Sequence, residues 1–139
     1  MITPDIEFQT AIRAALIADL AVTGLVPAES IRAGSTRPDK LPCIILANPQ
    51  TAHLGRTSGG AYLTRVFIDL HIWALEDGAD MARQIGGAAA VALWDAPQAD
   101  VVGIDAYERP GFNYMRDPDP ERAYCHGVGT VEGVIRWKV

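Results

Sequence analysis

The stretch RVFIDLHIWALEDG, residues 65–78, decides the fold. Side chains alternate between the two faces of a β-strand, so residues two apart share a face. One set of alternate positions in residues 65–74 is uniformly apolar: Val66, Ile68, Leu70, Ile72 and Ala74. We therefore predict a strand over residues 65–74 with this set facing a core, and a turn at Asp77-Gly78 that leads into a helix.

The residues before this strand predict a helix and another strand. Apolar residues recur at steps of four, at Phe8, Ile12, Leu16 and Leu20, and indicate one amphipathic helix that ends near Gly24. We expect the helix to start after Thr3-Pro4, with the Thr3 hydroxyl capping its first turn. Ile31 allows a short strand, and the apolar residues 43–47 predict a strand covered on both faces.

The residues after it predict a second helix that follows Asp77-Gly78 and is ended by Pro97, and strands over residues 100–107 and 127–139. Ala82, Gly86 and Ala90 lie on one face of this helix, which indicates the close approach of another element there. Val131, Ile135, Trp137 and Val139 are expected to share a face of the last strand. Together the elements predict one α+β domain over residues 1–139. It should have a mainly antiparallel sheet of about four to five strands and two helices packed on one face.

The composition fits a single domain and excludes several classes of protein. With 139 residues, 49% of them apolar, the chain can bury a core without metal or disulfide cross-links. No apolar run reaches the roughly 18 residues of a membrane span, and the N-terminus lacks a signal peptide, so we expect neither a membrane protein nor a secreted one. The net charge of −5 disfavours tight binding of nucleic acid. Cys43 and Cys125 are expected to be reduced.

Residue types that bind metals or catalyse reactions are present without the spacing that such sites need. The candidate soft ligands form no CxxC, HxxxH or HExxH motif; they are His53, His71, His126, Cys43 and Cys125. The acidic segment of residues 117–121 lacks the glycine and the bidentate acid of a calcium loop. No nucleophile elbow or phosphate-binding glycine motif occurs. We therefore predict no metal site, no cofactor and no enzymatic activity.

The second face of residues 65–74 has a different composition, because it mixes aromatic and charged side chains: Arg65, Phe67, Asp69, His71 and Trp73. This mixture is typical of a protein interface, and we interpret the face as one side of a subunit contact. The alternative is that the second helix covers this face and makes its aromatic residues part of the core.

Two further segments are candidates for contacts with other proteins. Residues 49–60 predict a loop or the tip of a long hairpin, and residues 108–122 predict a long loop. Aromatic and methionine side chains often anchor protein partners. The predicted contact residues in these segments are Arg56, Phe112, Tyr114, Met115 and Arg116.

Short motifs across nearly the whole chain resemble the tail-completion family of tailed bacteriophages and gene transfer agents. Leu70-His71-Ile72-Trp73, then Asp77-Gly78, Asp117-Pro118-Asp119 and His126-Gly127 match the family pattern in order and spacing. One departure is Arg32-Ala33-Gly34, which replaces an aromatic-acid turn often found after the isoleucine at position 31.

The resemblance implies a structural protein of a virion, assembled in the host cytoplasm and placed at the head–tail junction. Members of this family are tail terminators, which form a hexameric ring that caps the head-proximal end of the tail tube and stops its polymerisation. The implied partners are further copies of the chain, the tail tube protein and the head stopper or connector. DNA would pass through the ring without specific binding. The alternatives are another joining component, a stopper or adaptor, or a small-ligand-binding domain with a pocket lined by His71, Trp73 and Tyr107.

Overall fold

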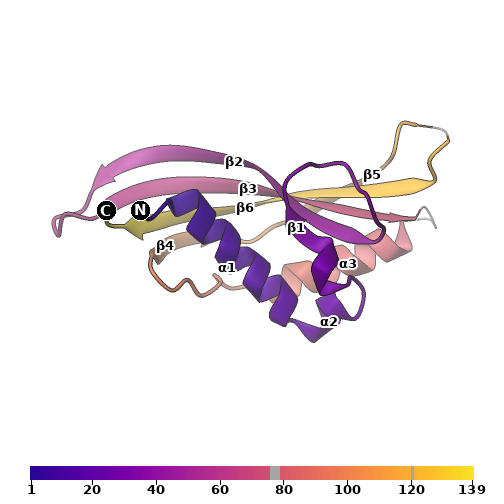
Figure 1. The fold of residues 1–139 in the computed structure, drawn as a ribbon, viewed down its shortest axis with the longest axis horizontal. Coiled ribbons are helices and arrows are strands. Elements are labelled where there is room, and N and C mark those ends of the chain that lie inside the picture. The colour runs from indigo at the N-terminus through magenta and orange to yellow at the C-terminus, as the bar shows by residue number, and fades with distance from the viewer. Residues whose placement is uncertain (76–78, 120) are drawn as a thin grey trace.

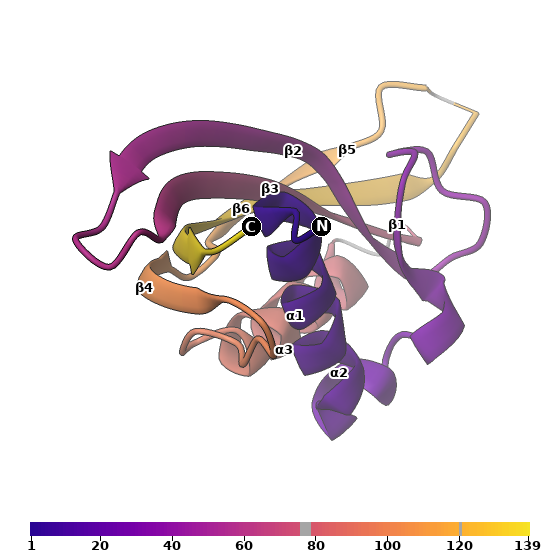
Figure 2. The ribbon, with the colours of Figure 1, turned by 60° about the vertical axis from the view of Figure 1, so that its left-hand side comes forward.

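The computed structural model describes residues 1–75, 79–119 and 121–139, and it confirms the predicted α+β class. Within these residues six strands form one open, mostly antiparallel sheet with the order β1-β2-β3-β6-β4, and β5 pairs with β6. The strands are β1 (Ile31–Ala33), β2 (Cys43–Arg56), β3 (Tyr62–Leu75), β4 (Gly103–Glu108), β5 (Phe112–Arg116) and β6 (Tyr124–Trp137). The helices α1 (Pro4–Ala18), α2 (Leu20–Thr23) and α3 (Asp80–Ala92) all lie on one side of the sheet (Figures 1 and 2). We call this side the inner face and the opposite side the outer face.

The central strand β3 shows the predicted alternation. Its five alternate apolar residues, from Val66 to Ala74, have no exposed surface and face the helices. β3 pairs with β2 on one side and with β6 on the other, antiparallel in both cases. The turn predicted at Asp77-Gly78 lies outside the described residues.

The sheet is larger than predicted in two places. β2 does not stop at Ala47 but continues to Arg56, so residues 49–60 take the hairpin alternative and form the end of a long β2–β3 hairpin. Likewise the loop expected over residues 108–122 contains β5, which pairs with β6 from Phe112–Gly129 to Arg116–Cys125. Both strands form because backbone pairing with a neighbouring strand satisfies their amides and carbonyls, and neither segment shows this in its own composition.

The N-terminal helix is interrupted once. Asp19 ends α1 and starts α2, because its carboxylate accepts hydrogen bonds from the amides of Ala21 and Val22 at 2.9 and 3.1 Å. The expected cap at the start of α1 is wrong in its detail. Thr3 occupies the N-cap position, but its side chain makes no capping hydrogen bond.

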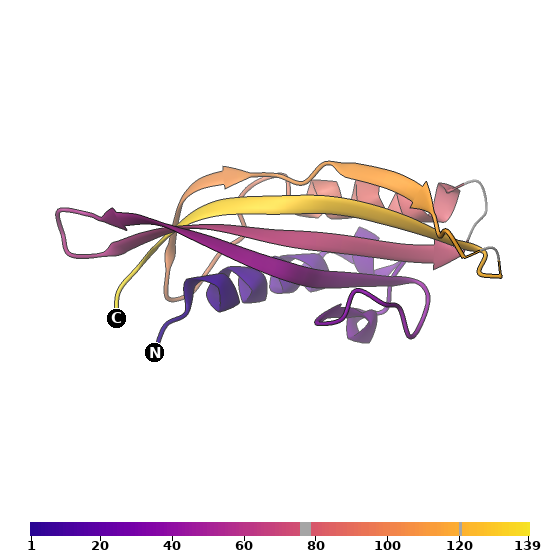
Figure 3. The ribbon, with the colours of Figure 1, turned by 90° about the horizontal axis from the view of Figure 1, so that it is seen from above.

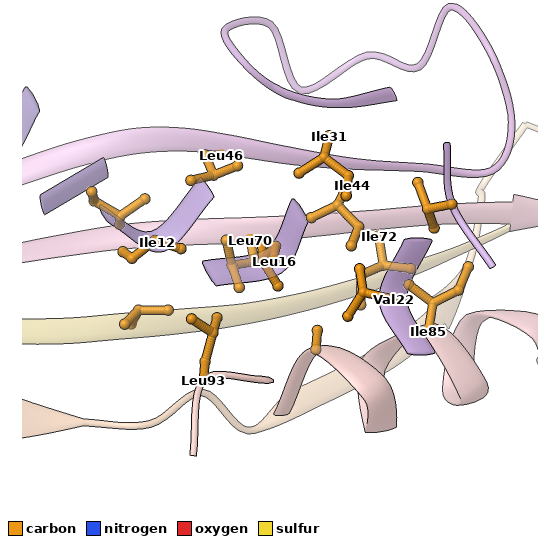
Figure 4. Packing of buried hydrophobic residues seen from close by; sticks show 14 of the residues in the cluster. Ile12, Leu16, Val22, Ile31, Ile44, Leu46, Leu70, Ile72, Ile85 and Leu93 are labelled. Atoms are coloured by element: carbon orange, nitrogen blue, oxygen red, sulfur yellow. The ribbon is translucent and has the colours of Figure 1, made fainter. Parts of the chain in front are cut away.

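The core fills the space between the helices and the inner face (Figure 4). Phe8, Ile12 and Leu16 of α1 and Ile85 of α3 have no exposed surface and pack with the inner residues of the sheet. Burial of each such large side chain stabilises the fold by about 1.5–3 kcal/mol. Among the described residues no helix is both long and apolar enough to span a membrane. Val139, expected on the buried face of the last strand, lies beyond β6 and is exposed.

Aromatic rings rest on glycines of β6 at the inner face. A Cβ on Gly127 would lie 2.9 Å from the Tyr114 ring, and one on Gly133 would lie 2.8 Å from the Phe8 ring. On the other side of Tyr114, a Cβ on Gly86 would overlap the hydroxyl. Tyr114 therefore fills a slot between α3 and β6, which is the close approach predicted at Gly86.

Candidate functional site

The outer face carries the five residues predicted as a subunit interface, and the structure divides them into two groups. His71 and Trp73 are buried, with 8% and 9% of their surface exposed, whereas Arg65, Phe67 and Asp69 are half-buried. The predicted interface is thus a covered end and an open middle of the sheet rather than one uniform surface. No helix covers it, because the helices lie on the inner face.

The covered end is closed by the chain segment between β1 and β2. The Trp73 indole Nε1 donates a hydrogen bond to the carbonyl of Thr36 at 2.9 Å. The Trp73 ring packs with Cys43, Ile45 and Ala47 of β2 in a second, smaller apolar cluster. This packing explains why residues 43–47 are apolar on both faces.

A pair of histidines lies beside Trp73. The His126 ring stacks on Trp73 with 3.8 Å between ring centroids, and its Nε2 lies 2.7 Å from Nδ1 of His71. The other nitrogen of His71, Nε2, is buried and has no hydrogen-bond partner among the residues that the structure describes. Burial lowers the pKa of both rings, and with the additional effect of His71 the pKa of His126 falls to about 4. Both imidazoles are therefore neutral at pH 7.

The open middle is organised by polar contacts across three strands. The Asp69 carboxylate accepts hydrogen bonds from Asn48 of β2 at 3.2 Å and from Thr130 of β6 at 2.8 Å. Arg65 lies 3.5 Å from Glu132 in a partly exposed ion pair. Phe67 stands between these polar groups on β3, directly opposite Gln50 and Glu132. The half-buried Phe67 ring thus lies between one ion pair and one hydrogen-bonded carboxylate, and its role as an interface residue stays a prediction.

Beyond this middle part the β2–β3 hairpin projects past the helices as an arm, which we define as residues 50–62 (Figures 1 and 3). Every β2 residue of the arm is exposed, and the Leu54 side chain has 49% of its surface accessible. Arg56 lies on the arm, where its guanidinium donates to the Tyr62 hydroxyl at 2.9 Å and packs over that ring.

The other four predicted contact residues belong to β5 and point in alternate directions. Phe112 and Tyr114 are half-buried on the inner face and pack against the main core. Met115 is on the outer face opposite His126 and is 46% exposed, and Arg116 is exposed. The predicted tube or stopper contacts therefore do not form one cluster, because Arg56 lies on the arm and the other four residues lie on the two faces of β5. The five predicted interface residues of β3 do not form one uniform surface either. Contacts within the chain account for Phe112 and Tyr114.

Comparison with known proteins gives the family. The profile of the family described as "Tail completion protein gp17" matches residues 10–136. The chain belongs to this family. Its fold is similar to that of a chain in a solved structure described as "Virion of native gene transfer agent (GTA) particle", with a TM-score of 0.58 and 18% identity. That likeness covers 98% of this chain and 99% of the other. No curated protein sequence matches the chain.

The pocket that the sequence suggested for a small ligand is not formed in this member of the tail completion family. The three residues predicted to line a pocket do not share one, because His71 and Trp73 are on the outer face, whereas Tyr107 donates from its hydroxyl to the carbonyl of Leu93 on the helix side. A groove of about 280 Å³ lies beside Arg65, Tyr107, Glu108 and Glu132, and one of about 250 Å³ beside Arg37, Trp73, Asp117 and Arg122. Both mix opposite charges.

The cysteines and histidines of this family member form no metal site in the part of the chain that the structure describes. Cys43 and Cys125 are buried, and no disulfide joins them. Burial raises the pKa of the Cys43 thiol to about 11, so this thiol stays protonated at neutral pH.

The sequence missed one feature of this site and gave another only as an alternative. The histidine pair joins residues 55 positions apart, and only the β3–β6 register places them together. A long hairpin is one of two predictions for residues 49–60, and the extent of the arm depends on pairing between β2 and β3.

Proposed function

We propose that the chain is the tail terminator of a tailed, phage-like particle. In this role several copies, six by analogy with the family, form a ring on the head-proximal end of the tail tube. The ring stops tube polymerisation and then binds the head stopper or connector, so that DNA passes through its centre. The role is structural rather than catalytic, and its place is the virion.

The observation that carries the proposal is the family match over residues 10–136, supported by the similar fold in a gene transfer agent virion. The surface of the chain is consistent with such a role. The core between sheet and helices is packed within the chain, while the open middle of the outer face is only half-buried and the β2 half of the arm is exposed. The negative net charge of −5 suits a conduit for DNA, because a strongly basic wall would bind phosphates and retard passage.

Addition of the purified chain to tail tube protein from the same particle tests the proposal. We expect tubes of limited length, each with one ring at one end, and heads that join only capped tubes. Negative-stain electron microscopy measures tube length, ring order and the fraction of joined heads. If the chain instead binds heads and leaves tube growth unchanged, it is a stopper or adaptor, and the terminator role is wrong.

A further inference from the structure

The arm has an edge that no other strand covers. β1 pairs with β2 only from Ile44 to Leu46, and within the described residues no strand pairs with that side of β2 beyond Leu46. The β2 half of the arm, Gln50 to Arg56, therefore exposes a row of backbone amides and carbonyls. It contains no proline and no lysine, two residues that often block such edges.

The opposite edge of the sheet is also open. β4 pairs with β6 on one side, and no described strand pairs with the other side of residues 103–108. Asp105, Ala106 and Glu108 of this strand are exposed. Figure 3 shows β2 and β4 at opposite margins of the sheet. A ring of identical subunits needs two different patches on opposite sides of each copy, and these edges satisfy that condition.

The open edges of β2 and β4 lie at the same height along the strands, and the two strands run in opposite directions. Ala52 pairs with Arg65, Arg65 with Val134, and Val134 with Ala106, so Ala52 and Ala106 stand in one row across four strands. A second row joins Gln50, Phe67, Glu132 and Glu108. Because each neighbouring pair of strands is antiparallel, β2 and β4 run in opposite directions. A second copy turned about an axis roughly along the strands would bring its β2 edge antiparallel to β4 of the first.

Charge favours the same pairing. On the β2 edge, residues 50–56 contain Arg56 and no acidic residue, whereas residues 103–108 of β4 contain Asp105 and Glu108 and no basic residue. Asp105 pairs with Arg136 within the chain, but Glu108 has no ion pair among the described residues. A basic edge and an acidic edge attract each other across a head-to-tail contact, and two copies of the same edge repel.

We infer that the partner of the arm is a second copy of this chain, whose β4 edge pairs with the β2 half of the arm through backbone hydrogen bonds. This rests on the proposed ring and specifies how its subunits join. Repeated around the ring, the contact makes the sheets of all copies continuous and pairs the open edges of the arm and of β4. The arm's backbone then provides affinity, and the half-buried Phe67 lies two strands from the junction on the outer face.

Engineered cysteines test the contact in assembled rings. In the double variants Ala52→Cys/Ala106→Cys and Ala52→Cys/Glu108→Cys, all three positions are exposed on the two edges. Within one copy these positions are separated by three strand spacings, roughly 14 Å, which is too far for an internal disulfide. The native Cys43 and Cys125 are 1% exposed and do not compete. The control Ala52→Cys/Thr10→Cys places the second thiol on exposed helix surface of the inner side.

Mild oxidation of rings on tube ends, followed by non-reducing gel electrophoresis, should give a ladder of covalent oligomers that ends at the ring order. Single-cysteine variants should give dimers at most, and the Thr10 control should give no ladder. Intact rings without a ladder from either edge pair would overturn the edge contact and leave the terminator role standing. A ladder of equal strength from the Thr10 control would overturn it as well. If no ring forms and tube growth is unaffected, both proposals fail.

Discussion

Replacement of Gly86 by alanine should destabilise the domain, whereas the same replacement at the adjacent Gly87 should stabilise it. Both glycines lie within α3, where alanine is favoured over glycine by about 1 kcal/mol. A Cβ on Gly87 meets nothing within 4 Å. A Cβ on Gly86 would overlap the Tyr114 hydroxyl and lie 3.0 Å from Cζ of the same ring.

The structure sets the size of the effect at Gly86. Tyr114 cannot move away from a new methyl group, because its ring already lies where a Cβ of Gly127 would be 2.9 Å distant. Overpacking of a rigid site costs about 1–3 kcal/mol, and the absence of free space favours the upper end. Alanine gains about 1 kcal/mol over glycine in a helix, and this gain offsets part of the overpacking cost. Gly86→Ala should therefore lower the free energy of unfolding by about 2 kcal/mol. Gly87→Ala should raise it by roughly 0.5–1 kcal/mol.

Urea unfolding of the isolated chain, followed by circular dichroism, measures both values. The variant Tyr114→Phe removes the overlapping oxygen, so the double variant Gly86→Ala/Tyr114→Phe should recover at least about 1 kcal/mol relative to additivity. If Gly86→Ala and Gly87→Ala stabilise the chain equally, the Tyr114 ring does not lie between α3 and β6. The pairing of β5 with β6 beneath α3 would then be wrong, and the segment would be the loop that its sequence suggests.

Three further perturbations separate folding from assembly. Trp73→Ala should lower the free energy of unfolding of the isolated chain by about 3–5 kcal/mol, because the ring is 9% exposed and hydrogen-bonded to Thr36; a loss below about 1 kcal/mol would show that the segment between β1 and β2 does not cover it. Phe67→Ala should cost about 1 kcal/mol in the same urea titration but reduce the fraction of capped tubes severalfold; unchanged capping would remove Phe67 from the interface. The pKa of His126 is lowered to about 4 in the folded chain. As the pH falls below about 6.5, this imidazole is therefore protonated in the unfolded chain but stays neutral in the folded chain until about pH 4. Stability should therefore fall between pH 6.5 and 4, by at most about 2 kcal/mol because solvent screens the partly exposed ring, and the stability of His126→Gln should fall less steeply.

The sequence predicts the centre of this sheet well because the deciding pattern is local. The alternation from Val66 to Ala74 specifies a face of β3 without knowledge of any other strand, and those residues are buried. The same holds for Phe8, Ile12 and Leu16 of α1, whose spacing alone places them on one stripe. The break at Asp19 is harder to foresee, because the choice between continuing a helix and capping a new one depends on small differences in local hydrogen bonding.

The margins of the sheet could not be predicted in the same way because their strands exist through pairing. Residues 50–56 contain Gln, Thr, His, Gly and Arg in no regular alternation, and β3 holds them in register. β5 is short and lies between prolines, yet its aromatic rings fit the glycines of β6. Gly127, Gly129 and Gly133 lie an even number of residues apart and therefore share the inner face of β6. This pattern can be recognised in the sequence. Glycines that recur on the buried face of a strand leave room for large side chains from elsewhere in the chain.

Trp73 illustrates why the candidate site could be only partly predicted. Alternation places it correctly on the face opposite the core, together with Phe67. It cannot distinguish a ring that a neighbouring chain would cover from one that a distant segment of the same chain covers. That distinction depends on the path of residues 34–42, which contain proline, glycine and charged residues and carry no periodicity.

The division of the outer face into a covered end and an open middle allows folding and assembly to be tested separately. At the covered end Trp73, His126 and the segment between β1 and β2 complete a second apolar cluster, so substitutions there act on the monomer. In the open middle the inner face is already packed against α1, whose Phe8 ring lies over Gly133, while the outer face carries the partly exposed Arg65–Glu132 ion pair. A substitution at an exposed edge position, such as Ala52 of β2 or Ala106 of β4, therefore leaves the core intact. Any loss of rings that it causes reports on the contact between copies rather than on the stability of each copy.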